Sequence, residues 1–231
     1  MSFKMRVQIH SDIHIEKYPR RRLRSQASHL ILAGDIGVPV FTSFREFFRD
    51  TSREFDKIIY VLGNHEYERT WMGIDKNNYS LLEEKFNQRN NLVHQIISEF
   101  KNIILLDNSS IVLNNKIIFG STLWTNYHQR RSDKTLSTVE QFITQQHFIA
   151  LPKIQHVNPH LLITHYVSNR SFLKKPWSIG LGPSTLIRSP RTIFGHIHYT
   201  ICEENASYRE KVFCNPWGEE ESPKEMFVDL D

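Results

Sequence analysis

The sequence contains no long apolar segment and almost no cysteine. No run approaches the ~20 consecutive apolar residues that a membrane-spanning helix needs, so we expect no membrane partner. The opening MSFKMRVQIH is broken by Gln8 and His10 and lacks the apolar core of a secretory signal. The only cysteines, Cys202 and Cys214, do not have metal-ligand spacing, which favours a reducing compartment. We therefore expect a cytoplasmic protein in which both thiols are buried as small apolar side chains.

The chain also lacks low-complexity tracts, internal repeats and linkers rich in Pro, Gly or Ser. Its 231 residues, of which 39% are hydrophobic, predict one globular domain over residues 1–231. A net charge of +4 permits an anionic substrate but does not require nucleic acid. The charge is unevenly distributed, because KYPRRRLRS at 17–25 is basic and EEESP at 219–223 is acidic.

Short apolar runs that stop at a polar or glycine-containing corner predict buried strands. Five such runs occupy residues 5–9, 29–33, 57–62, 160–164 and 191–194. Residues 103–124 predict antiparallel strands around turns at Asn108-Ser109 and Asn114-Asn115, a second hairpin spans 199–214, and a last strand spans 226–230.

Helical patterns lie between these runs. Phenylalanines recur at helical spacing in residues 41–55, and Ser80 with Glu83 and Ser137 with Glu140 form the pattern of capping boxes. Together the elements predict a layered α/β fold with a mixed sheet or two packed sheets.

Each of the five apolar runs is followed by Asp, Asn or His, and none is followed by a thiol or a candidate serine nucleophile. Taken singly, each polar group is compatible with a turn or a surface position, as are the two histidines of GHIH. Together they predict a metal site, because the carboxyl ends of strands in an open α/β sheet meet at one edge. The candidate ligands are Asp12, His14, Asp35, Asn64, His165, His196 and His198.

Seven ligands exceed what one catalytic metal uses, since such a metal keeps three protein ligands and an open position. The set fits two divalent ions that share a carboxylate, and Asp35 is the best candidate for that bridge. Such ligands suit Mn, Fe, Zn, Co or Ni, of which we favour manganese.

The ordered motifs SDIH, GD, GNHE, TH and GHIH resemble the calcineurin-like metallophosphoesterase superfamily. Softer matches, such as HSDIHIEKYP and VFCNPWG, resemble its small single-domain members. The resemblance implies a four-layer α/β/β/α sandwich with two packed mixed sheets. It also implies hydrolysis of a phosphodiester or phosphomonoester, with nucleotides among the candidates, by in-line attack of a metal-bridging hydroxide.

The same resemblance implies a division of the ligands. One metal would take Asp12, His14, Asp35 and His198, and the other Asp35, Asn64, His165 and His196. His65 would lie over the site as the general acid rather than as a ligand. GHIH would then serve both ions, with Gly195 allowing a close approach of the backbone.

Two departures qualify the resemblance. Asp35 is followed by IGVPVFTSF, without the Asp-Arg-Gly of protein Ser/Thr phosphatases, so the acidic partner of the catalytic histidine and the phosphate-binding arginine are missing there. Tyr166 stands where many small phosphoesterases have a second histidine, and we expect it to pack.

Several alternatives stay open. The arginines of 17–25 either lie at the mouth of the site or form a solvated loop. Residues 166–183, with Arg170, Lys174, Lys175 and Trp177, either cover the metals or fold back. A metal-dependent nuclease and a non-catalytic scaffold are the rival functions, nucleic acid is not the favoured partner, and the sequence does not give the oligomeric state.

Overall fold

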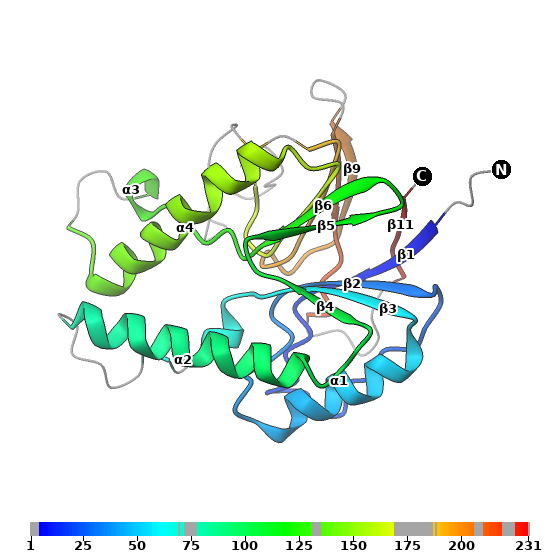
Figure 1. The fold of residues 1–231 in the computed structure, drawn as a ribbon, viewed down its shortest axis with the longest axis horizontal. Helices are drawn as coiled ribbons and strands as arrows, with labels where there is room; N and C mark the ends of the chain where they lie inside the picture. The colour runs from blue at the N-terminus through cyan, green and yellow to red at the C-terminus, as the bar shows by residue number, and fades with distance from the viewer. Residues whose placement is uncertain are drawn as a thin grey trace.

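Two mixed β-sheets form the centre of the molecule in the computed structural model (Figure 1). It describes residues 5–68, 70–71, 78–130, 135–168, 187, 189–205, 210–218 and 225–230. The first sheet has the order β11-β1-β2-β3-β4, in which β1 to β4 are parallel and β11 is antiparallel to β1. Its strands are β1 (Met5–His10), β2 (His29–Ala33), β3 (Lys57–Val61), β4 (Ile103–Leu106) and β11 (Phe227–Leu230).

The second sheet has the order β5-β6-β7-β8-β10-β9. Strands β6, β7, β8 and β10 are parallel, and antiparallel β5 and β9 form its edges. Its strands are β5 (Ser109–Leu113), β6 (Lys116–Ser121), β7 (Leu161–Thr164), β8 (Arg191–Phe194), β9 (Ile201–Asn205) and β10 (Glu210–Cys214).

Alternating side chains of the inner strands fill a core on each face of the first sheet. In β2, Ile31 and Ala33 face the second sheet, whereas Leu30 and Leu32 face the helices. The core between the sheets continues through Ile118 of β6 and other buried aliphatic side chains. The apolar runs of the sequence are continuous because both faces of these strands are buried.

Helices cover the outer faces of both sheets (Figure 1). They are α1 (Thr42–Glu54), α2 (Tyr79–Ile97), α3 (Tyr127–Arg130), α4 (Thr138–Val157) and the short 3-10 helix η1 (His65–Tyr67). From α1, Phe44, Phe47 and Phe48 pack against the first sheet, and Ala150 and Ile154 of α4 pack against the second. The predicted four-layer α/β/β/α sandwich is confirmed. No helix in these ranges combines the length and apolar character needed to cross a membrane.

Most of the predicted local structure is confirmed. The hairpins β5–β6 and β9–β10, the last strand β11, and the capping box of Ser137 and Glu140 at the start of α4 are all present. The prediction for Ser80 is wrong: α2 is capped by Asn78, whose side chain accepts from Leu81 N at 3.0 Å. Asparagine is a good cap and here lies two residues earlier, which places Ser80 inside the helix.

Two further predictions are wrong. Asn108 turns the chain at φ 49°, but it connects β4 of one sheet to β5 of the other instead of closing a hairpin. The unbroken apolar run 103–106 pairs in parallel with β3, whereas β5 is an exposed edge strand. Cys214 is buried as expected, but Cys202 is exposed because it lies on the edge strand β9.

Candidate metal centre

The predicted ligands lie where the two sheets meet, just past the carboxyl ends of five strands. Asp12 and His14 follow β1, Asp35 follows β2 and Asn64 follows β3, while the remaining three histidines follow β7 and β8. Backbone hydrogen bonds hold these corners together. Asp12 N donates to Gly34 O at 3.0 Å, and Gly195 N donates to His165 O at 3.1 Å.

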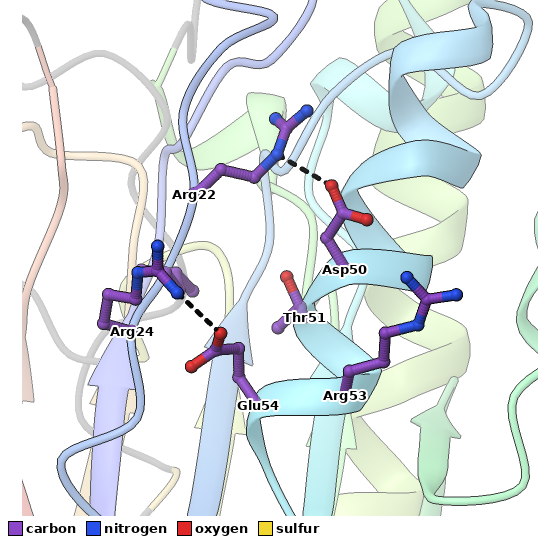
Figure 2. Close-up of a pocket in the computed structure, with 7 residues that line it drawn as sticks. Arg22, Arg24, Asp50, Thr51, Arg53 and Glu54 are labelled. Atoms are coloured by element: carbon purple, nitrogen blue, oxygen red, sulfur yellow. Dashed lines mark hydrogen bonds and ion pairs between the residues drawn. The ribbon is translucent and has the colours of Figure 1, made fainter.

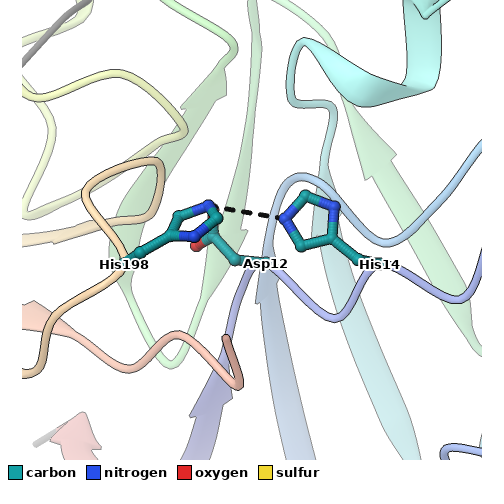
Figure 3. A group of neighbouring side chains, drawn as sticks. All are labelled: Asp12, His14 and His198. Atoms are coloured by element: carbon teal, nitrogen blue, oxygen red, sulfur yellow. Dashed lines mark hydrogen bonds and ion pairs between the residues drawn. The ribbon is translucent and has the colours of Figure 1, made fainter. Parts of the chain in front are cut away.

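The first group of ligand atoms comes from Asp12, His14 and His198, all within 4.8 Å of one another. His14 Nε2 lies 3.4 Å from His198 Nε2, and His198 Nε2 lies 3.3 Å from Asp12 Oδ1 (Figure 3). The Asp12 carboxylate also accepts from Ser11 Oγ and from His196 N. Two ring nitrogens and a carboxylate oxygen that converge in this way resemble ligands of one cation.

The second group comes from Asp35, His165 and His196, again within 4.8 Å. His165 Nδ1 is 2.9 Å from Ala33 O, and a carbonyl only accepts, so Nδ1 carries the hydrogen. In the neutral ring Nε2 then carries a lone pair and can only accept. It nevertheless lies 3.2 Å from Asp35 Oδ2 and 3.1 Å from Asn64 Oδ1.

A ring lone pair and a carboxylate oxygen that face one another, as His165 Nε2 and Asp35 Oδ2 do, need a proton or a cation between them. Burial alone would lower the pKa of His165, but the charge of Asp35 raises it to about 9. Without a metal, therefore, a proton on His165 Nε2 lies between the ring and the Asp35 carboxylate. These residues therefore fit a divalent ion, which would replace that proton.

Asp35 belongs to both neighbourhoods, because its carboxylate also lies within 4.8 Å of ligand atoms of His14 and His65. Burial would raise the pKa of Asp35, yet the positive charges of His165, His65 and His14 hold it well below its usual range. The pKa of Asp12 is likewise lowered, against the effect of burial, by His198 and His165. Both acids are ionised, as metal ligands must be. The structure thus brings all seven predicted ligands into two adjacent groups that Asp35 joins.

The backbone of this centre is unusual. Left-handed φ angles between 52° and 70° occur at Asp12, His14, Asp35, His196 and His198. Such angles are uncommon for residues other than glycine and cluster at functional sites. The tightly packed strand corners hold them in place. At Gly195, for example, a Cβ would lie 2.7 Å from Ala33 O and 2.8 Å from Asp12 Oδ2, which confirms the predicted close approach.

His65 lies beside the two groups with its ring 24% exposed. Its Nε2 is 4.0 Å from Asp35 Oδ2, while Nδ1 is 3.0 Å from Glu68 Oε2 and 3.4 Å from Glu16 Oε1. Burial would lower the pKa of His65, but the hydrogen bond to Glu16 and the charges of Asp35, Glu16 and Glu68 raise it to about 9. A protonated imidazole is therefore held at the rim of the centre when no cations are bound.

Sequence reasoning missed the roles of two glutamates. Glu66, fully buried, accepts hydrogen bonds from three backbone N–H groups and from Tyr60 Oη. Glu16 Oε1 lies 3.0 Å from His14 Nδ1. Burial would raise the pKa of Glu16, but hydrogen bonds with His14 and His65 lower it to about 2. A signal existed in both cases, since Glu66 is the acid of GNHE and Glu16 lies two residues after a ligand.

Tyr166 packs, as expected. Its ring is buried and lies against the ring of His196, with the centroids 4.2 Å apart and the planes inclined by 34°. It also contacts Trp124, whose ring centroid is 5.8 Å away. Tyr166 therefore fixes the orientation of a predicted ligand.

Arg22 and Arg24 of the basic segment 17–25 lie away from the candidate metal centre. Arg22 Nε is 2.8 Å from Asp50 Oδ2, and Arg24 pairs with Glu54 at 3.0 Å (Figure 2). The two pairs line a cavity of about 300 Å³ at the C-terminal end of α1. Since α1 runs from the end of β2 to the start of β3, this cavity lies at the opposite edge of the sheet.

Arg21 has a structural role. It is buried, donates to Ile13 O at 2.7 Å, and stacks on Tyr18 and Trp217. Arg22 and Arg24 therefore fit the solvated-loop alternative for 17–25, whereas Arg21 fits neither alternative because it is buried. Arg170, Lys174, Lys175 and Trp177 lie outside the described residues, as does the acidic stretch 219–223.

Comparison with known proteins places this geometry among related folds. A family model described as calcineurin-like phosphoesterase matches residues 5–200. An uncharacterised protein of Acanthamoeba polyphaga mimivirus is 34% identical over 117 residues, which are 49% of this chain and only 38% of that protein. The crystal structure of phosphopantetheinyl hydrolase from Mycobacterium tuberculosis superposes with a TM-score of 0.68 at 15% identity, covering 100% of this chain and 97% of that one. At that identity the likeness is one of fold.

Proposed function

This chain belongs to the calcineurin-like phosphoesterase family, and from that membership we propose that it hydrolyses phosphoric esters with two divalent metal ions. One ion would be held by Asp12, His14, Asp35 and His198, and the other by Asp35, Asn64, His165 and His196, which is compatible with the clusters that these side chains form. The observation that carries the proposal is the Nε2 lone pair of His165, which faces oxygens of Asp35 and Asn64 while its Nδ1 donates to Ala33 O.

The bound pair would supply a hydroxide near neutral pH and neutralise charge on the phosphoryl oxygens. The protein's own contribution is orientation. Ala33 O fixes the tautomer of His165, and Glu16 does the same for His14, so that each presents Nε2 to the centre. Buried Asp12 and Asp35 stay ionised because histidines surround them.

His65 is the general acid in this proposal. Its Nδ1 faces carboxylates and its Nε2 faces the centre, 4.0 Å from Asp35 Oδ2, so a proton on Nε2 is available to a departing alkoxide. The raised pKa of His65 favours the protonated form. Bound cations nearby would lower this pKa again, toward neutral pH. General acid catalysis of this kind contributes about 10²–10⁴-fold.

We propose phosphodiesters or phosphomonoesters as substrates, nucleotides among them, and manganese as the favoured ion. A phosphopantetheinyl hydrolase with the same fold is compatible with a small phosphorylated substrate. The nuclease alternative gains nothing from Arg22 and Arg24, which pair with acids at the far edge. The complete ligand set disfavours a scaffold.

The test is turnover of p-nitrophenyl phosphate and bis(p-nitrophenyl) phosphate by protein loaded with Mn²⁺, Co²⁺ or Ni²⁺. We expect hydrolysis by the wild type, none by Asp35→Asn, and wild-type rates from Asp50→Asn, which removes a carboxylate at the opposite edge. Absence of hydrolysis with every ion and both substrates would support the scaffold instead.

A further inference from the structure

The acid that partners the catalytic histidine in protein Ser/Thr phosphatases is missing after Asp35, where residues 36–45 contain no Asp or Glu. The structure brings carboxylates to His65 from two other segments. Glu16 arrives from the corner after β1, and Glu68 follows η1. His65 therefore has acidic partners, although the segment after Asp35, where protein Ser/Thr phosphatases carry that acid, contains none.

We propose that Glu16 is the positioning residue that holds His65 in the orientation needed for proton donation. The proposal rests on the function proposed above, which makes His65 the general acid. It assigns to the segment after β1 a task that the segment after β2 performs in protein Ser/Thr phosphatases.

The segment that carries Glu16 is fixed beside the Asp35 corner. His14 N donates to Asp35 O at 3.1 Å and Ile15 N donates to Ile36 O at 2.9 Å. Gly37 makes room for this contact, because a Cβ there would collide with Ile15 and lie 3.2 Å from Glu16 Oε2. Glu16 therefore has little freedom to move away from His65.

Burial distinguishes the two carboxylates near His65. Glu68 Oε2 accepts a well-formed hydrogen bond from His65 Nδ1 at 3.0 Å, whereas Glu16 Oε1 makes a longer ion-pair contact with it at 3.4 Å. The side chain of Glu68, however, is 45% exposed, whereas that of Glu16 is 7% exposed. Water screens an exposed carboxylate and lets it move, while a buried one interacts more strongly and keeps its direction. We therefore assign the dominant role to Glu16 despite the longer distance.

One oxygen of Glu16 serves two rings. Oε1 lies 3.0 Å from His14 Nδ1 and, as an ion-pair partner, 3.4 Å from His65 Nδ1, whose hydrogen bond goes to Glu68 Oε2. Because carboxylates only accept, both Nδ1 atoms carry a hydrogen. Each ring then directs Nε2 to the centre, His14 as a ligand and His65 as an acid. The rings also pack edge to face, with centroids 4.5 Å apart.

The kinetic test compares Glu16→Gln with Glu68→Gln at saturating Mn²⁺, using p-nitrophenyl phosphate and phenyl phosphate. Phenolate is the poorer leaving group and depends more on the proton. For Glu16→Gln we expect kcat on phenyl phosphate to fall about tenfold or more beyond any fall on p-nitrophenyl phosphate. Glu68→Gln should cost no more than about fivefold, as for an exposed ion pair. Glu54→Gln, at the far edge, is the control.

A double-mutant cycle separates the His65 arm from the His14 arm. In a His65→Ala background, Glu16→Gln should cause no further discrimination between the two substrates. If the loss is equal for both substrates, or persists undiminished without His65, Glu16 acts only through the ligand His14 and the proposal is wrong.

A second readout does not depend on turnover. In metal-free protein at one fixed pH, nitrogen NMR of the histidine side chains should show His65 with a hydrogen-bonded Nδ1–H, and Glu16→Gln should shift that signal much more than Glu68→Gln does. The opposite ranking overturns the proposal. If the wild type hydrolyses no ester, the proposed function fails while this measurement still tests the position of His65.

Discussion

Substitution of Glu66 should loosen the centre without removing any ligand. Its carboxylate accepts from Asp35 N at 3.1 Å and Gly63 N at 2.8 Å through Oε2, and from Ile36 N and Tyr60 Oη, both at 2.7 Å, through Oε1. Glu66 therefore ties the Asp35 corner to the Gly63 corner. It also holds Asp35 at its left-handed φ of 54°.

The cost of Glu66→Gln follows from these contacts. The amide keeps one oxygen and gains an NH₂ group that only donates. If NH₂ takes the Oε1 position, Tyr60 Oη can reverse and accept from it, which leaves Ile36 N alone without a partner. One buried unsatisfied donor costs about 1–3 kcal/mol. If the NH₂ group takes the Oε2 position instead, two donors, Asp35 N and Gly63 N, lose their acceptor. We expect Glu66→Ala, which strands all three N–H groups, to cost about 3 kcal/mol or more.

Urea unfolding of the metal-free protein measures this cost, and calorimetric titration with Mn²⁺ measures the effect on the centre. Loss of a partner behind a ligand typically lowers metal affinity about 10–100-fold. Glu46→Gln, an exposed carboxylate on α1, is the matched control. Glu66→Gln with wild-type Mn²⁺ affinity and stability within about 0.5 kcal/mol would refute the reasoning, because surface substitutions already span that range.

Three further predictions concern the same region. His65→Ala should lower kcat about 10²-fold or more while metal analysis still finds two ions, and loss of both ions would contradict its role as a non-ligand. His196→Ala and His198→Ala should each weaken a different metal position in anomalous diffraction, and identical loss patterns would count against the division. Burial lowers the pKa of His10 to about 3. Below pH 6.5, therefore, His10 becomes protonated in the unfolded chain while it stays neutral in the folded protein. Between pH 7 and 5 this should remove about 2 kcal/mol of stability in urea unfolding, a loss that His10→Asn should escape.

The sequence predicted the strands and the meeting of the candidate ligand residues at one edge, because each has a local signature. Buried runs such as 29–33 end at a glycine or a polar corner, and the fold brings those ends to one edge. Contacts between distant corners were not predictable in the same way. The sequence around Glu16 contains no pattern that places it 3.4 Å from His65, because that contact depends on how two strand corners pack.

Errors arose where tertiary context decided between similar local patterns. Asn108 has the features of a hairpin turn, but its flanking strands belong to different sheets. The sequence left the place of Arg22 and Arg24 open. They follow the first candidate ligand motif, yet they lie against α1, where they pair with Asp50 and Glu54. Adjacency in sequence to a ligand was therefore a poor guide to adjacency in space.

A titration of metal-free protein with Mn²⁺, followed by hydrolysis of bis(p-nitrophenyl) phosphate, tests the central claim most directly. Two adjacent ligand groups joined by Asp35 predict that activity reaches its plateau at two ions per chain. Full activity at one ion per chain, or the absence of activity at any ratio, would contradict a two-metal phosphoesterase.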